Sequence, residues 1–124
     1  PIVEHELAFG PENLKLPREE IRARIENTLL LLDISRLRDH ETSTLSFGQK
    51  KIVALAALLT LSPQIYLLDE PGAGLSSDNI KKVKEIILNL ARESRIVFIA
   101  DHNSEILEIS NRTINLGKKN HVCN

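Results

Sequence analysis

The spacing of apolar residues changes along this chain, and each spacing predicts a different kind of element. In "LPREEIRARIENTLLLL" (residues 16–32), apolar side chains recur every three to four positions, at Ile21, Ile25, Leu29 and Leu32. This period places them on one face of a helix. We therefore expect an amphipathic helix over this stretch.

A second helix is predicted from about Gly48 to Leu61, after a polar connection over residues 33–44. It should end before Ser62-Pro63, because the residue that precedes a proline is pushed out of the helical backbone region. The first half of the chain is therefore predicted to be mainly helical. Before residue 45, only the start of the chain, from residue 3 to residue 9, has a pattern compatible with a strand.

Short and uninterrupted apolar runs predict strands in the second half. The runs are Ile65–Leu68 and Arg95–Ala100, and a last strand is expected over Arg112–Leu116. Continuous apolar runs of this kind are typical of strands buried on both faces of a parallel sheet. We therefore expect the first two runs to be covered from both sides.

Helices are predicted between these strands. Ser76 or Ser77 can cap the first of them, and a shorter one is expected over Ser104–Glu108. The apolar positions of the longer helix are Ile80, Val83, Ile86, Ile87 and Leu90. Helices that alternate with strands predict parallel βαβ units, and hence an α/β fold.

Composition narrows the class of protein. The 124 residues are 42% hydrophobic and 27% charged, which is typical of a globular chain. A net charge of −1 gives no broad basic surface, so we expect no nucleic-acid partner. The single cysteine, Cys123, fits a reducing compartment. No apolar run reaches the roughly 18 residues that span a bilayer, and no leader-like segment opens the sequence.

Charged and polar side chains follow the two central strands. Asp69 and Glu70 end the first, and Asp101 and His102 end the second. Ligands of open α/β sheets sit at the carboxyl ends of the strands, so we expect these side chains to meet at one edge. Adjacent acids suit magnesium-assisted phosphoryl transfer, in which one holds the metal and the next activates water. Taken singly, each of these residues is also compatible with a solvated loop or a helix cap.

The stretch "TLSFGQKK" (residues 44–51) is typical of an anion-binding turn that opens a helix. Backbone N–H groups and the helix dipole would point at the anion. Ser46 adds a hydroxyl donor, and Gly48 permits close approach of the backbone. Lys50 and Lys51 are interpreted as solvated residues of the helix.

The order of these motifs resembles that of the ABC-type ATPases, the nucleotide-binding subunits of ABC transporters. "LSFGQ" resembles their signature motif, "IYLLDEP" the Walker B strand, "AGLSSD" the D-loop and "IADH" the switch-histidine strand. The opening "VEHELAFGPENLKLPREEI" resembles the segment after the Q-loop in energy-coupling-factor and cobalt or nickel importer ATPases. The resemblance covers nearly the whole chain.

The resemblance implies a role for each motif residue. Asp69 would be the carboxylate on the side of Mg²⁺, Glu70 the general base and His102 the switch that contacts the γ-phosphate of ATP. The D-loop would contribute Gly74 and Ser76. The signature residues would bind ATP held by a second ATPase subunit, and they are Leu45, Ser46, Phe47, Gly48 and Gln49.

The resemblance also implies a division of the fold. A helical signature subdomain would occupy residues 1–61, and the C-terminal half of a RecA-like P-loop NTPase core, with parallel strands, residues 62–118. Residues 119–124 would form a tail. The phosphate-binding pattern G-x-x-x-x-G-K-[ST] is absent from the sequence. We therefore expect the C-terminal part of a larger subunit, which alone neither binds ATP tightly nor hydrolyses it.

Three residues depart from the family pattern. Phe47 replaces a glycine, and would be strained if its φ were positive. Ser76 stands where the D-loop usually carries aspartate, and Asp101 where a small hydroxyl residue is common. The first two bear on signalling between paired sites.

The implied parent is an ATP hydrolase that drives uptake of a metal ion or a vitamin. It would be cytoplasmic, peripheral at the inner face of the cell membrane and held there by a transmembrane subunit. The isolated chain should self-associate, because the strand that leads into the phosphate loop in this family would be missing, which leaves an open sheet edge and an apolar surface without packing. The alternatives are the C-terminal head lobe of a chromosome-maintenance or DNA-repair ATPase, and a degenerate subunit that acts as an interaction module. The absence of sustained heptads before residue 45 favours the transporter.

Overall fold

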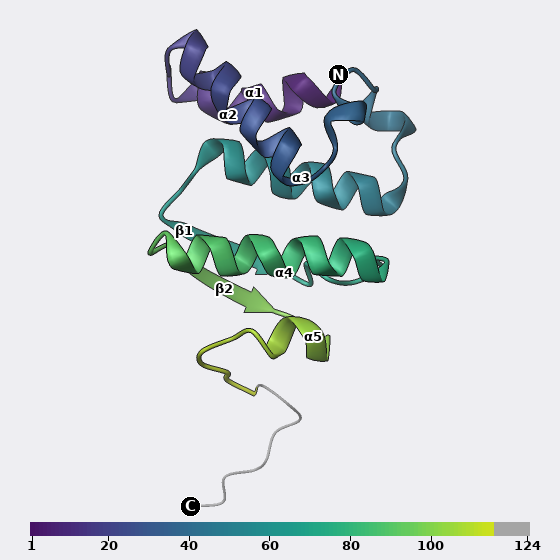
Figure 1. The fold of residues 1–124 in the computed structure, drawn as a ribbon, viewed down its shortest axis with the longest axis vertical. Coiled ribbons are helices and arrows are strands. Elements are labelled where there is room, and N and C mark those ends of the chain that lie inside the picture. Colours follow the sequence, from purple (N-terminus) through teal and green to yellow (C-terminus); the bar gives the residue numbers. More distant parts are fainter. Residues whose placement is uncertain (116–124) are drawn as a thin grey trace, which may run out of the picture.

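The computed structural model describes residues 1–115, which form a helical part followed by a small parallel sheet with its helices (Figure 1). The helical part lies at one end of the molecule, and α5 lies toward the other. The elements are α1 (Val3–Asn13), α2 (Arg18–Leu31), the 3₁₀ turns η1 (Ser35–Leu37) and η2 (Thr42–Thr44), α3 (Phe47–Leu61), β1 (Ile65–Asp69), α4 (Ser77–Arg92), β2 (Ile96–Ala100) and α5 (Ser104–Leu107). No helix among residues 1–115 is both long and apolar enough to cross a membrane.

The first element is a helix, so the strand expected over residues 3–9 is wrong. Val3 and Leu7 are fully buried, and Pro11 continues the series on the same face of α1. A spacing of four positions fits both the period of a strand and that of a helix. Packing of α1 against α3 decides between them, and that contact is not encoded in the local pattern.

Pro11 lies inside α1 and therefore cannot donate a backbone hydrogen bond to the carbonyl of Leu7. The hydroxyl of Thr60, on α3, donates to that carbonyl instead, at 2.8 Å. Both Thr60 and Leu7 are fully buried. The same hydroxyl also lies 2.9 Å from the carbonyl of Ala57. A buried carbonyl without a donor is costly, so the bond to Leu7 adds to the apolar packing that holds α1 on α3.

The predicted helices of the first half are confirmed. On α2, Ile25 and Leu29 are buried, and Leu32 is buried just after its end. The other helix, α3, ends at Leu61, and Ser62 takes a left-handed conformation with φ 55°. The division at residue 61 between two domains stays a prediction.

The two strands pair in parallel, from Ile65 opposite Ile96 to Asp69 opposite Ala100. The predicted βαβ arrangement is confirmed. In α4 between them, the buried positions are the five predicted ones, Ile80, Val83, Ile86, Ile87 and Leu90.

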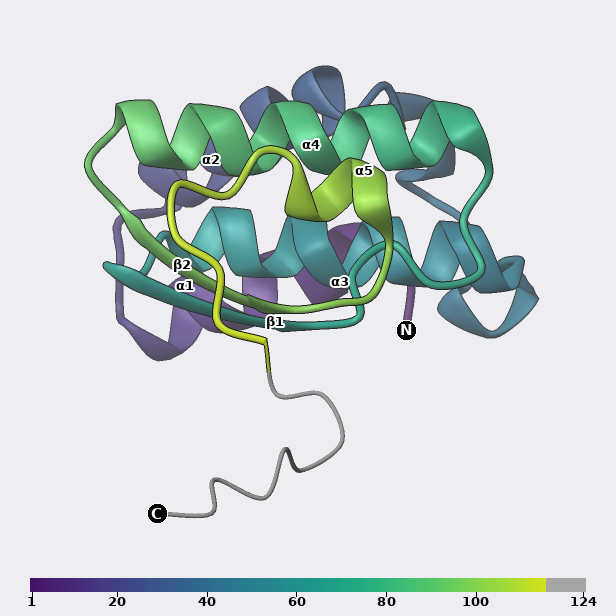
Figure 2. The same ribbon diagram turned by 90° about the horizontal axis from the view of Figure 1, so that it is seen from below.

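Burial of the strands on both faces is wrong for residues 1–115. Figure 2 shows α4 and α5 on one side of the strands. On the other face Ile65, Leu67, Ile96 and Phe98 are 52–74% exposed. The physical reason is that no helix among the described residues covers this face. We call these four residues the open sheet face.

The strand expected over Arg112–Leu116 is also wrong where it can be checked. Residues 112–115 are not in a strand, and Leu116 lies outside the described residues, as do residues 117–124. A strand requires a neighbouring strand with which its backbone groups pair. In the described sheet β1 and β2 pair only with each other.

Candidate functional site

The charged residues at the strand ends meet at one edge of the sheet, as the sequence predicts. Asp69 ends β1, and Glu70 and His102 follow their strands in the adjacent loops. The Nδ1 atom of His102 lies 3.4 Å from Oε1 of Glu70. Both side chains are exposed, at 81% and 53%. The edge therefore presents a carboxylate and an imidazole to a ligand from the solvent side.

The backbone of Glu70 has an uncommon conformation. Its φ is 46°, in the left-handed region that residues other than glycine rarely adopt. Its N–H donates to the carbonyl of Ala100 at 2.6 Å. Such conformations cost on the order of 1–3 kcal/mol and persist where the surroundings hold them. The loop that begins at Glu70 is therefore held in place by specific contacts.

Asp101 supplies one set of these contacts. Its Oδ2 accepts from the backbone N–H of Gly72 at 3.1 Å. Its Oδ1 accepts from the N–H groups of His102 and Asn103, each at 2.8 Å. The carboxylate thus joins the loop after β1 to the loop after β2. Sequence reasoning missed this role, although an acid two residues before an asparagine cap is a usable signal.

Lys51 supplies the other set, so its interpretation as a solvated residue is wrong. Its Nζ donates to the carbonyl of Glu70 at 2.6 Å and to that of Ala73 at 2.9 Å. The acceptors are backbone atoms that lie 19 and 22 residues further along the chain. No local sequence signal distinguishes such a lysine from a solvated one.

The turn before α3 has the predicted form of a helix opening. Ser46 is the N-cap, with its Oγ accepting from the N–H of Gln49 at 3.3 Å. Gln49 returns a bond, because its Oε1 accepts from the N–H of Ser46 at 2.9 Å. This capping box uses the Ser46 oxygen as an acceptor and leaves its hydroxyl hydrogen able to donate to an anion.

The remaining signature residues have distinct environments. Leu45 is 6% exposed and belongs to the hydrophobic core. Phe47 begins α3 and is not among the residues with positive φ, so the strain that would follow from a positive φ does not arise. A Cβ at Gly48 would only reach ordinary contact, at 3.4 Å from the Asn79 side chain. Within residues 1–115, therefore, no close packing explains this glycine.

The D-loop residues shape the turn into α4. Ser76 is the N-cap of this helix, and its Oγ accepts from the N–H of Asn79 at 3.3 Å. Gly74 has φ 72°, and a Cβ there would lie 2.8 Å from Cε1 of Phe47. Glycine is thus required at position 74 both for its backbone angle and for the ring beside it. Nucleotide contacts of Gly74 and Ser76 stay a prediction.

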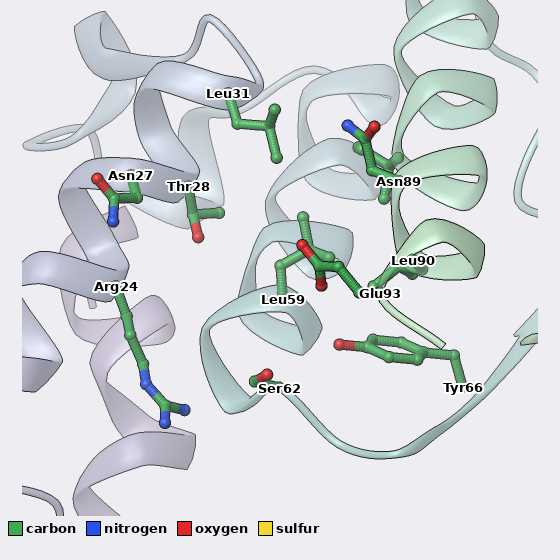
Figure 3. A pocket seen from close by; sticks show the side chains of 11 residues that line it. Arg24, Asn27, Thr28, Leu31, Leu59, Ser62, Tyr66, Asn89, Leu90 and Glu93 are labelled. Atoms are coloured by element: carbon green, nitrogen blue, oxygen red, sulfur yellow. The ribbon is translucent and has the colours of Figure 1, made fainter. Parts of the chain in front are cut away.

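A separate cleft of about 230 Å³ lies between α2, α3 and α4 (Figure 3). Its lining includes Arg24, Ser62, Tyr66 and Glu93. Ser62 caps the end of α3 and Tyr66 is the second residue of β1, whereas Glu70 follows the carboxyl end of that strand. Because ligands of parallel sheets bind at the carboxyl ends, this cleft is not the candidate site.

Comparison with known proteins agrees with this geometry. A family model described as "ABC transporter" matches residues 2–73. The energy-coupling factor transporter ATP-binding protein EcfA3 of Clostridium perfringens is 39% identical over 108 residues, which are 86% of this chain and 38% of that protein. The corresponding EcfA of Methanothermobacter thermautotrophicus is 38% identical over 107 residues, 86% of this chain and 34% of that protein.

Solved structures give the same fold. The structure of CbiO1 from Clostridium perfringens, part of the ABC transporter complex CbiONQ, is 39% identical with a TM-score of 0.69. The match covers 82% of this chain and 41% of that chain. A dimeric bacterial ABC transporter cassette has a TM-score of 0.77 at 24% identity, over 87% of this chain and 49% of that one, and supports the fold alone.

These matches identify the α/β fold as part of the RecA-like ATPase cassette with its helical signature region. The chain spans less than two fifths of the length of the two curated relatives described above. The family model covers more than half of the chain, including the signature turn and β1. The chain therefore belongs to the ABC transporter family, as a relative of its ATP-binding subunits.

Proposed function

We propose that this chain is the signature and Walker B part of a subunit that hydrolyses ATP to drive uptake of a small solute. The convergence of Glu70 and His102 at the carboxyl edge of the sheet, 3.4 Å apart, carries the proposal. A metal ion or a vitamin is the proposed solute, and the similarity to energy-coupling factor transporter proteins supports that class. No observation favours the DNA-repair alternative.

The roles follow from the positions of the side chains. Asp69 is exposed at the end of β1 and would hold Mg²⁺, a metal that usually takes one or two carboxylates and completes its shell with water and phosphate. Bound Mg²⁺ would neutralise charge on the phosphates. Glu70 would accept the proton of the attacking water. His102, beside it, would donate a hydrogen bond to a terminal phosphate oxygen.

The signature turn would serve a second subunit. The hydroxyl hydrogen of Ser46 and the N–H groups of the first turn of α3 would donate to an anion, which suits the γ-phosphate of ATP held by the partner. We therefore propose a pair of ATPase subunits, the same or different, docked on a transmembrane subunit at the cytoplasmic face of the membrane. The helical part, residues 1–61, and the core part, residues 62–118, are the proposed domains.

The chain by itself should not bind MgATP tightly. Its sequence has no phosphate loop, so the lysine, the magnesium-binding hydroxyl and several N–H donors are missing. Each charge-assisted hydrogen bond contributes on the order of 1.5–3 kcal/mol, and the loss of three or more weakens binding by roughly a thousandfold. In a calorimetric titration of the 124-residue chain, a micromolar dissociation constant would contradict this.

The catalytic role is tested in the full-length subunit, with and without Glu70→Gln. Glutamine keeps the shape of the side chain and removes the base. We expect nearly complete loss of turnover with ATP binding retained, and accumulation of a closed dimer on ATP. Glu85→Gln, a change in the middle of α4 that lies away from the strand ends, is the matched control. Turnover that survives Glu70→Gln would assign Glu70 to a solvated turn and end the proposal.

A further inference from the structure

We propose that Lys51 is a positioning residue for Glu70, an inference that rests on the catalytic role proposed for Glu70. Lys51 lies on α3, the helix that opens with the signature turn, and contacts the loop from Glu70 to Ala73 in the same chain, which we call the catalytic loop. It would therefore tie the position of the general base to the position of the anion-binding helix.

The contacts concentrate on the backbone at both ends of a tight turn. Nζ of Lys51 bonds to the carbonyls of Glu70 and Ala73 at 2.6 and 2.9 Å. The carbonyl of Glu70 also accepts from the N–H of Ala73 at 3.1 Å. Hydrogen bonds from an ammonium group are roughly twice as strong as neutral ones. The ammonium therefore bridges the two ends of the turn in which Glu70 adopts its left-handed conformation.

Phe47 helps to orient this lysine. The two residues are four apart on α3 and so lie on the same helical face. The Lys51 ammonium lies 5.6 Å from the centroid of the Phe47 ring, within the range of a cation–π contact. The same ring packs against Gly74, in the loop that Lys51 holds. Phe47, which departs from the family pattern, thus belongs to the support of the catalytic loop.

The two supports of the loop approach it from different elements. Lys51 contacts it from the helical part, and Asp101 contacts it from the loop after β2. Loss of either should leave the strands in place and change only the placement of the Glu70 carboxylate. A displacement of about 1 Å at a reacting group can lower a rate by about a hundredfold.

The variants must remove the ammonium without removing the packing of its stem. Lys51→Met keeps an unbranched apolar side chain, and Lys51→Arg keeps a cation that can still reach carbonyl oxygens. Lys50→Met is the matched control, because Lys50 is the neighbouring residue on α3, is exposed, and lies outside these contacts.

The first readout is amide hydrogen exchange in the 124-residue chain. The N–H of Ala73 bonds inside the turn that Lys51 closes, so its exchange should become about tenfold faster in Lys51→Met. Lys51→Arg should restore most of the protection, and Lys50→Met should leave it unchanged. Amides of α4 serve as an internal reference for global stability. If the N–H of Ala73 exchanges at the same rate in Lys51→Met and in the parent chain, Lys51 does not hold this turn and the proposal is wrong.

The second readout is steady-state ATP hydrolysis by the full-length subunit. Lys51→Met should lower kcat between about tenfold and a hundredfold and leave KM for ATP within about twofold. Lys51→Arg should recover most of the rate. Glu70→Gln is measured in parallel. If Glu70→Gln abolishes turnover and Lys51→Met does not lower it, the positioning role is wrong and the proposed function stands. If Glu70→Gln has no effect, the proposed function itself fails.

Discussion

The helical part and the sheet part of this molecule differ in how completely they bury their apolar residues. In the helical part, Val3, Leu7 and Leu32 are fully buried by α1, α2 and α3 themselves. In the sheet part, the open sheet face exposes up to 74% of a leucine, Leu67, and 61% of a phenylalanine, Phe98. The helical part thus has a core made by its own helices, although Phe9 and Leu30 stay exposed at 67% and 69%, whereas the sheet part has packed only one face of its sheet.

This difference lies in what covers the apolar residues of each region. The helices of the first part cover one another, and the Thr60 bond to Leu7 joins two of them. The strands carry apolar residues on both faces, a pattern typical of sheets with helices on each side. The loop that begins at Glu70 leaves from the sheet part, and Lys51 connects it to the helical part.

The largest expected effect is on association. Several hundred Å² of apolar surface on the open sheet face, at about 25 cal/mol per Å², corresponds to several kcal/mol for whatever covers it. We expect the isolated chain to form a dimer or larger assembly through this face. The double variant Leu67→Lys, Phe98→Lys places two charges on residues that are partners across the strand pair, in the middle of the open sheet face. It should be a monomer. Light scattering on dilute protein measures the mass.

A matched control lies in the helical part. Leu30 on α2 is also exposed, at 69%, but the residues four and three positions before it on the helix, Glu26 and Asn27, are polar. Leu30→Lys should leave the assembly unchanged. A monodisperse mass near 13.9 kDa for the unaltered chain would refute self-association.

The type of each element was predictable from the sequence, whereas the coverage of the sheet face was not. The spacing of Ile25 and Leu29, and the apolar run at Ile65, depend only on neighbours along the chain, so helix and strand were predictable. Coverage of a sheet face depends on other segments. For that reason the exposure of Leu67 was not predictable from its own run, although its strand was.

The second prediction compares two leucines. Leu29 is 1% exposed in the helical part, and Leu67 is 74% exposed in the sheet part. Leu29→Ala should lower the free energy of unfolding by about 3 kcal/mol, through lost burial and a cavity. Leu67→Ala should change it by less than about 0.5 kcal/mol. Urea unfolding, with both changes made in the Phe98→Lys background, measures the difference. Similar values for the two would remove the contrast.

The third prediction concerns the bond between α1 and α3. Thr60→Val keeps the volume of the side chain and leaves the Leu7 carbonyl without its donor, because Pro11 has no N–H. We expect a loss of about 1–3 kcal/mol in the free energy of unfolding. In a Pro11→Ala background the restored N–H can reach the same carbonyl. The cost of Thr60→Val should then be smaller, and an unchanged cost would show that the hydroxyl acts by other contacts.

The candidate site shows the same limit of sequence reasoning. Glu70 and His102 were predictable as neighbours, because the carboxyl ends of adjacent parallel strands meet. Lys51 and Asp101 were not recognised as supports of the loop. Lys51 acts on backbone atoms 19 and 22 residues away, and such atoms leave no signature in the side-chain sequence. For Asp101, the bonds to the N–H groups of His102 and Asn103 are local, but the bond that supports the loop goes to Gly72, 29 residues away.

The smallest expected effect is a pH dependence within the helical part. Arg38 donates to both carboxylate oxygens of Glu4 at 2.9 Å, which joins α1 to the segment after η1, and also pairs with Glu26. The hydrogen bonds from Arg38 hold the pKa of Glu4 below its ordinary value of 4.5. A lowered pKa stabilises the fold above pH 4.5, and this contribution is lost as pH falls through the lower folded-state value.

Glu4→Gln removes this contribution without removing the side chain. Because the pair is partly exposed, at 29% and 35%, we expect it to contribute less than about 1 kcal/mol. Urea unfolding should show the variant less stable than the parent at pH 7, with the difference shrinking as pH falls below 4.5. Glu12→Gln, an exposed change on the same helix outside this ion pair, should give no such difference. If the stability difference between Glu4→Gln and the parent does not change with pH, the effect comes from packing and not from charge. The reason is that a contribution from the charge of Glu4 must disappear when this carboxylate is protonated.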